Sequence, residues 1–140
     1  MPSSPLTVAI IVAYHPNLAD LNQLIEVTSA QVGRVIIVDN SPSPADALSE
    51  LDPSDKIRYV SLGENMGIAH AQNIGIEFAV DQRANYVLLL DQDSMPEERM
   101  VERLLSGIAD SQNSLPNIIA ASPQYYDPRT NFRSLFMVSK

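Results

Sequence analysis

The sequence predicts an α/β protein with an open, mostly parallel sheet and flanking helices. Four short apolar runs, rich in β-branched residues and bounded by turn residues, have the composition of parallel strands buried on both faces. Segments with helical apolar spacing lie between these runs, and such alternation favours right-handed crossovers in one sheet. A length of 140 residues suits one globular domain. We therefore expect a single domain over residues 1–140.

Charge and composition exclude several classes of function. The formal net charge is −8, and the nine Lys and Arg residues are scattered, which opposes binding to nucleic acid. The chain contains no cysteine, so it has neither disulfides nor thiolate zinc ligands. Its N-terminal apolar run lacks the features of a secretory signal and is too short to cross a bilayer. We expect a cytoplasmic protein with no membrane span in this segment.

The expected elements follow one another along the chain. Strands are predicted at residues 6–13, 34–39, 56–62 and 86–91, and helices at residues 17–33, 67–81 and 96–110. Asn17 is expected to cap the first helix and Gly33 to close it. Pro96, with two glutamates after it, is expected to open the third helix. The apolar pattern at residues 132–140 resembles a further strand.

Two aspartates follow the fourth predicted strand with one residue between them. In an extended segment the side chains of Asp91 and Asp93 point to the same side, where two carboxylates repel unless a proton or cation intervenes. Mg²⁺ or Mn²⁺ binds one or two such carboxylates and completes its shell with water and phosphate oxygens. The spacing therefore indicates a metal–diphosphate site. The alternative is a solvated acidic turn in which Asp93 or Ser94 caps the following helix.

Other polar residues follow the remaining strands, where ligands of open α/β sheets collect. Asp39 ends the second strand and could accept a hydrogen bond from a ribose hydroxyl or a pyrimidine N–H, or could form an Asx turn. Tyr14 follows the first strand and could stack on a nucleobase or pack against the sheet rim. Gly67 stands where a helix begins, with N–H groups available to an anion. The glycine spacing matches neither a P-loop nor a dinucleotide fingerprint, so NAD is not expected.

Four motifs, in this order, resemble one family. "VAIIVAYHPN", "VIIVDNSP", "ENMGIAHAQNIGI" and "YVLLLDQDSMP" are similar to the nucleotide-sugar-binding half of family 2 glycosyltransferases, which have the GT-A (Rossmann-like) fold. Within that family, "AQNIGI" and "DQDS" are most similar to bacterial rhamnosyltransferases that use dTDP-rhamnose. The resemblance covers the chain up to about Met100. It implies a chain truncated after the nucleotide-binding half of a longer enzyme.

The resemblance also implies roles for particular residues. Asp39 would bind the base or nucleoside, and Asp91 and Asp93 would bind Mg²⁺ or Mn²⁺ on the donor diphosphate. Many relatives carry Arg at the position of Gln72, which can donate a hydrogen bond but cannot neutralise charge. The implied substrate-binding residues are Ala13, Tyr14, Asp39, Gly67, Gln72, Asn73 and Asp91.

The implied reaction is an inverting sugar transfer. A hydroxyl of a polysaccharide or lipid-linked glycan would attack the anomeric carbon of dTDP-rhamnose, or of another pyrimidine diphosphate sugar, as the nucleoside diphosphate leaves. The catalytic base is expected outside this chain, so the segment itself would bind the donor only. The full-length protein would work in the cytoplasm, at the inner face of the membrane.

Two alternatives stay open at this point. One is a Mg²⁺-dependent phosphohydrolase of the haloacid dehalogenase type, in which the first aspartate of D-x-D is the nucleophile. Its motif normally opens the domain, whereas "DQDS" follows the fourth strand here. The other is a non-catalytic module that binds a nucleotide sugar. An exposed edge strand in an incomplete sheet would also allow a homodimer to form.

Overall fold

The computed structural model describes residues 4–43, 55–124, 126–127, 129–130 and 132–133. The chain divides into two compact units, Met1–Pro96 and Glu97–Lys140, and each is described by itself. The single domain over residues 1–140 stays a prediction.

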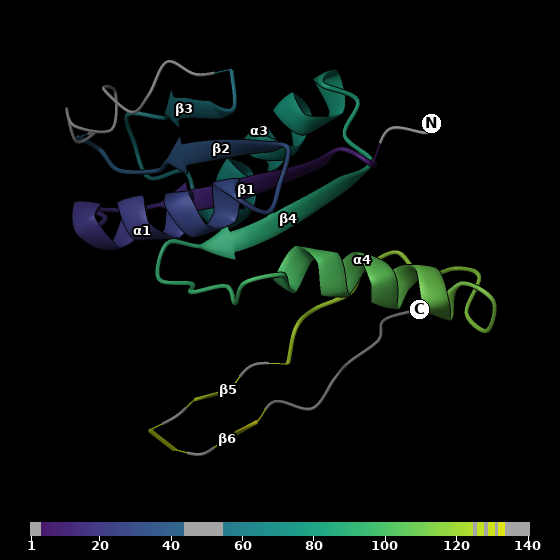
Figure 1. The fold of residues 1–140 in the computed structure, drawn as a ribbon. Coiled ribbons are helices and arrows are strands. Elements are labelled where there is room, and N and C mark those ends of the chain that lie inside the picture. The colour runs from purple at the N-terminus through teal and green to yellow at the C-terminus, as the bar shows by residue number, and fades with distance from the viewer. Residues whose placement is uncertain (1–3, 44–54, 125, 128, 131, 134–140) are drawn as a thin grey trace. The chain divides into compact units, whose positions relative to one another are not determined.

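The first unit is built on a four-stranded parallel sheet with the order β3-β2-β1-β4 (Figure 1). The strands are β1 (Thr7–Ala13), β2 (Arg34–Asp39), β3 (Ile57–Ser61) and β4 (Tyr86–Asp91). All four were predicted from β-branched apolar runs, and their bounds agree with the prediction to within one residue. The parallel pairing confirms the α/β class.

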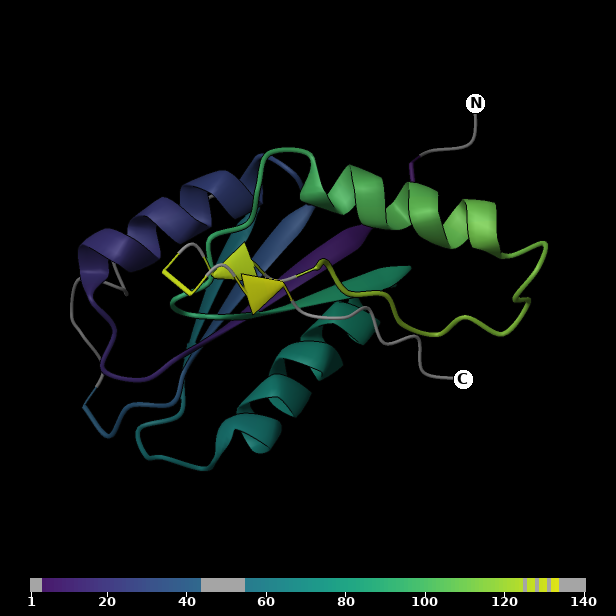
Figure 2. The same cartoon turned by 90° about the horizontal axis from the view of Figure 1, so that it is seen from below.

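Two helices cover opposite faces of this sheet, α1 (Leu18–Ser29) and α3 (Ile68–Asp81) (Figure 2). The side chain of Asn17 accepts hydrogen bonds from two backbone N–H groups of the first turn of α1, which confirms the predicted cap. The predicted closure at Gly33 is wrong, because α1 already ends at Ser29. Gly33 instead donates from its N–H to the carbonyl of Thr7 at 3.0 Å, where the chain enters β2.

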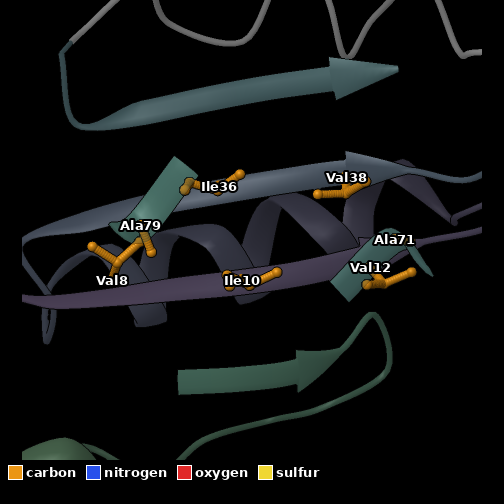
Figure 3. Close-up of a cluster of buried hydrophobic side chains, with 7 residues drawn as sticks. All are labelled: Val8, Ile10, Val12, Ile36, Val38, Ala71 and Ala79. Carbon is orange, nitrogen blue, oxygen red and sulfur yellow. The ribbon is translucent and has the colours of Figure 1, made fainter. Parts of the chain in front are cut away.

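Small residues bring α3 close to the centre of the sheet. Ala71 and Ala79 are fully buried against a cluster of aliphatic side chains from β1 and β2 (Figure 3). A Cβ atom built on Gly75, between them, would lie 2.5 Å from Cγ2 of Ile10. Ile68, the first residue of this helix, is 54% exposed. The fully buried residues of α3 are therefore spaced four apart and have little or no side chain, while Ile76 and Phe78 pack against the same cluster and are partly buried.

Burial on both faces is confirmed only for the central strands. Every residue of β1 is buried, as is β2 from Val35 onward. In β4, Val87 is 38% exposed and Leu89 is 45% exposed, and β3 has no fully buried residue. The prediction was wrong for β3 and β4 because each lies at an edge of the sheet with a single neighbouring strand.

The second unit contains α4 (Met100–Ser111) and an antiparallel pair of short strands, β5 (Tyr126–Asp127) and β6 (Phe132–Arg133). The helix was expected to start at Pro96, but it begins four residues later. Arg99 adopts the left-handed conformation with φ 64°, which ends the preceding turn and prevents the helix from extending backwards. Of the strand expected at residues 132–140, residues 134–140 lie outside the described part. No helix in the described ranges is both long and apolar enough to cross a bilayer.

We predict that Gly75→Ala destabilises the first unit by roughly 1–3 kcal/mol, because the added methyl group overpacks the contact with Ile10. Gly107→Ala is the matched control. It also lies inside a helix, but no described atom lies within 4 Å of the position that its methyl group would take, so helix propensity should raise stability by about 0.5–1 kcal/mol. Urea unfolding of both variants measures the difference. Equal effects of the two substitutions would contradict the close packing of α3.

Candidate functional site

The carboxyl ends of β2, β1 and β4 lie side by side at one edge of the parallel sheet (Figure 1). Ala13, the last residue of β1, is the register partner of Asp39, the last residue of β2. Val12 is the partner of Asp91, the last residue of β4. Ala13, Asp39 and Asp91, three of the residues singled out from the sequence, therefore end adjacent strands.

Asp39 is fully buried, and both of its carboxylate oxygens accept hydrogen bonds. The backbone N–H of Ser41 donates to Oδ1 at 3.0 Å, which is the Asx turn that the sequence had offered as an alternative. The hydroxyl of Tyr59 on β3 donates to Oδ2 at 2.6 Å. These two donors hold the carboxylate in one orientation.

The sequence did not single out Tyr59 as a site residue, and its contact with Asp39 follows from its place in the sheet. Tyr59 is the register partner of Ile37. Ile37 lies two residues before Asp39 in β2, so both side chains are on the same face of the sheet. Burial raises the pKa of the Tyr59 hydroxyl above its ordinary value of 10.0, and the hydrogen bond to Asp39 and the negative charge there raise it further. Tyr59 therefore stays protonated and remains a donor to Asp39 at neutral pH.

Two asparagines join the end of β2 to the start of α3. Asn40 donates from Nδ2 to Oδ1 of Asn65 at 3.0 Å, and its own Oδ1 accepts from the N–H of Met66 at 2.8 Å. Asn65 Oδ1 also accepts from the N–H of Gly67 at 3.0 Å. Gly67 has φ 86° at the N-cap of α3, a conformation that disfavours side chains. The pair of asparagines thus determines where α3 begins relative to β2.

The segment from Asp91 to Ser94 is a turn. The N–H of Ser94 donates to the carbonyl of Asp91 at 3.0 Å, and β4 ends at Asp91. The expected extended conformation of this segment is therefore wrong, since this hydrogen bond curls the chain after the strand. The helix-cap alternative is also wrong, because α4 starts at Met100 and has no side-chain cap.

The carboxylates of Asp91 and Asp93 are exposed, and neither accepts a hydrogen bond nor forms an ion pair with a described residue. Within the described ranges, no cluster of three or more His, Cys, Asp or Glu side chains is arranged to hold a metal ion. Two free carboxylates fit a hard cation such as Mg²⁺, which keeps several waters or phosphate oxygens in its shell. They do not form a cage that would bind a cation by protein ligands alone.

Tyr14 continues directly from β1, with its side chain 44% exposed. Its ring packs edge-on against the ring of His15, with 4.4 Å between the centroids. The backbone of Tyr14 is hydrogen-bonded to the side chain of Gln92, the residue between the two aspartates. His15 has φ 43°, and its N–H donates to Oγ of Ser41 at 2.8 Å. The chain after β1 is therefore attached both to the end of β2 and to the turn after β4.

Gln72 and Asn73 lie on α3 beyond its first turn. Gln72 is half-buried and Asn73 is exposed. No hydrogen bond among the described residues joins either side chain to Asp39, Asp91 or Asp93. The structure therefore groups Ala13, Tyr14, Asp39, Gly67 and Asp91 through strand pairing and hydrogen bonds. Asp93 joins this group only through its place in the chain beside Gln92, and the two amides lie outside the network.

Comparison with known proteins identifies the family. The sequence model described as "Glycosyl transferase family 2" matches residues 9–136, which extend across both units. This chain belongs to glycosyl transferase family 2. Membership favours the glycosyltransferase interpretation over the phosphohydrolase alternative, and it agrees with the predicted GT-A type of sheet.

A curated relative adds a more specific similarity. The chain is 34% identical over 130 residues to a protein of Shigella flexneri named dTDP-rhamnosyl transferase RfbF. The aligned part is 89% of this chain and 43% of the relative. This family 2 chain therefore spans less than half the length of the curated relative that it matches.

We predict that Tyr59→Phe destabilises the protein by roughly 1–3 kcal/mol at pH 8, because the buried carboxylate of Asp39 loses one of its two donors. The pKa of Tyr59 is raised in the folded state, so the stabilisation is complete below pH 10 and is lost as the pH rises further. The difference in unfolding free energy between the unaltered chain and Tyr59→Phe should shrink above pH 10 by about 1.4 kcal/mol per pH unit.

Urea unfolding at pH 8 and pH 11 measures this difference. Tyr86→Phe is the matched control, because the Tyr86 hydroxyl, on β4 of the same sheet, has no hydrogen bond to a described residue. A stability gap between the unaltered chain and Tyr59→Phe that does not change with pH would contradict the assigned hydrogen bond.

Proposed function

We propose that this chain is the donor-binding part of a glycosyltransferase that transfers rhamnose from dTDP-rhamnose to a hydroxyl of a polysaccharide or lipid-linked glycan, with inversion. The observation that carries the proposal is the set of neighbouring strand ends. Asp39, a buried hydrogen-bond acceptor, lies on one side of Tyr14 and the end of β1. The two free carboxylates of Asp91 and Asp93 lie on the other side. Family membership and the name of the relative support the class of reaction.

The base would bind at the Asp39 side of the site. A carboxylate only accepts hydrogen bonds, so it selects donors such as a ribose hydroxyl or the N3–H of thymine or uracil. Two of its acceptor positions are taken by Ser41 and Tyr59, which leaves capacity for a ligand. Because Asp39 is fully buried, contact also requires a shift of the side chains that cover it. The exposed ring of Tyr14 would pack against the base from the end of β1.

The diphosphate would bind at the side of Asp91 and Asp93. A protein with a net charge of −8 and two free carboxylates repels a diphosphate unless a cation lies between them. We propose that Asp91 and Asp93 hold Mg²⁺ or Mn²⁺ together with diphosphate oxygens and water. The cation would stabilise the negative charge that develops on the leaving phosphate.

In the reaction, the acceptor oxygen forms a bond to the anomeric carbon while the bond from that carbon to the diphosphate oxygen breaks. The proton of the acceptor hydroxyl must pass to a base, and we expect this base outside the chain. The segment would therefore supply binding and orientation of the donor, and further residues would supply the acceptor site.

We expect this chain to bind dTDP and UDP more tightly in the presence of Mn²⁺ than in EDTA, and to bind GDP and ADP more weakly. Isothermal titration with the four nucleotides, with and without Mn²⁺, measures this preference. Asp93→Asn should weaken dTDP binding with Mn²⁺ by roughly tenfold or more, about 1.4 kcal/mol, because it removes one charge from the cation site. In EDTA the same substitution should have little effect.

The matched control is Asp81→Asn, which makes the same change in charge at the exposed C-terminal residue of α3. Asp39→Asn should weaken binding of both dTDP and thymidine, since it acts on the base and not on the diphosphate. Equal affinity for dTDP in Mn²⁺ and in EDTA would argue against the cation bridge.

A further inference from the structure

Gln92 makes two hydrogen bonds to the backbone of one residue. Its Oε1 accepts from the N–H of Tyr14 at 2.6 Å, and its Nε2 donates to the carbonyl of Tyr14 at 3.1 Å. The last register pair between β1 and β4 is Val12 with Asp91, so Gln92 directly follows this pair on β4 and Tyr14 follows it two residues later on β1. The side-chain amide has one acceptor and two donors, so it satisfies a backbone N–H and C=O as a neighbouring strand would. Gln92 therefore extends the pairing of β1 with β4 beyond the point where the two backbones separate.

The same contact joins the two halves of the candidate site. Gln92 lies between Asp91 and Asp93, in the turn closed by the hydrogen bond from Ser94 to Asp91. Tyr14 carries the exposed ring at the end of β1. Any movement of the turn away from β1 would break both hydrogen bonds of Gln92. The separation between the Tyr14 ring and the carboxylates thus depends on this amide.

We propose that Gln92 is a positioning residue that couples the binding of the nucleobase to the binding of the cation and diphosphate. This inference rests on the proposed function, because it assigns the base to the Tyr14 side and the diphosphate to the Asp91 and Asp93 side. Gln92 itself contacts neither ligand in this proposal. It fixes the two groups relative to each other, so that binding of one end of a nucleoside diphosphate places the other end.

The chemistry of the contact explains why an amide is needed. Glutamate has the same shape and can still accept from the N–H of Tyr14, but it places a second carboxylate oxygen against the carbonyl of Tyr14. Methionine has a similar length and provides no strong donor or acceptor. Gln92→Glu therefore breaks one of the two bonds and adds repulsion, and Gln92→Met removes both. Gln92 is half-exposed, so water can replace the lost partners and the fold should persist.

The test compares three probes on the unaltered chain, Gln92→Met, Gln92→Glu and a control. Thymidine reports on the base side alone, Mn²⁺ by electron paramagnetic resonance reports on the carboxylates alone, and dTDP with Mn²⁺ reports on both. The matched control is Gln23→Met, which makes the same substitution at an exposed position of α1. Thermal unfolding of every variant shows whether the fold is retained.

We expect Gln92→Met and Gln92→Glu to weaken dTDP with Mn²⁺ roughly tenfold, and to change thymidine and Mn²⁺ alone by less than about twofold each. The coupling role would be overturned if the loss of affinity for dTDP were no greater than the losses for thymidine and for Mn²⁺ combined. Unchanged affinity for dTDP would overturn it as well. If the unaltered chain shows no Mn²⁺-dependent binding of dTDP, the proposed function fails and this inference fails with it. If the unaltered chain binds dTDP and the Gln92 variants bind equally well, only this inference fails.

Discussion

The parallel hydrogen bonding of β1 to β2 and to β4 is the constraint on which the candidate site depends. Because the three strands run in one direction, the chain leaves each of them at the same edge of the sheet. The register also matters, since a slip of one residue would turn Asp39 to the opposite face, away from Tyr59. The buried aliphatic residues of β1 and β2 oppose such a slip, because it would move the whole apolar set as well.

Close packing of α3 against the sheet also positions the loop that precedes this helix. The small residues Ala71, Gly75 and Ala79 let the helix approach the centre of the sheet, and Asn40 and Asn65 attach its first residues to the end of β2. The candidate site is thus supported from two directions, by a rigid sheet and by a helix whose start is held by side-chain hydrogen bonds.

Local patterns predicted the regular elements well and the transitions between them poorly. Apolar runs located all four strands, and Asn17 marked the start of α1, because burial and capping depend on neighbouring residues. The end of α1, the start of α4 and the shape of the D-x-D segment were wrong. Each of these depends on the backbone conformation of a few residues, such as the left-handed Arg99 or the turn from Asp91 to Ser94. The local sequence is compatible with several backbone conformations of similar energy at such positions.

By itself the sequence determined the α/β class, the order of the strands along the chain and the polar residues that follow them, since these depend on composition and periodicity. Only the tertiary structure decided which of these residues have partners. Tyr59 meets Asp39 across 20 positions and Gln92 meets Tyr14 across 78, through strand pairing that no local pattern encodes. The physical reason is that a side chain forms a hydrogen bond only with a polar group that lies within about 3 Å of it. The register of the sheet decides which groups lie that close.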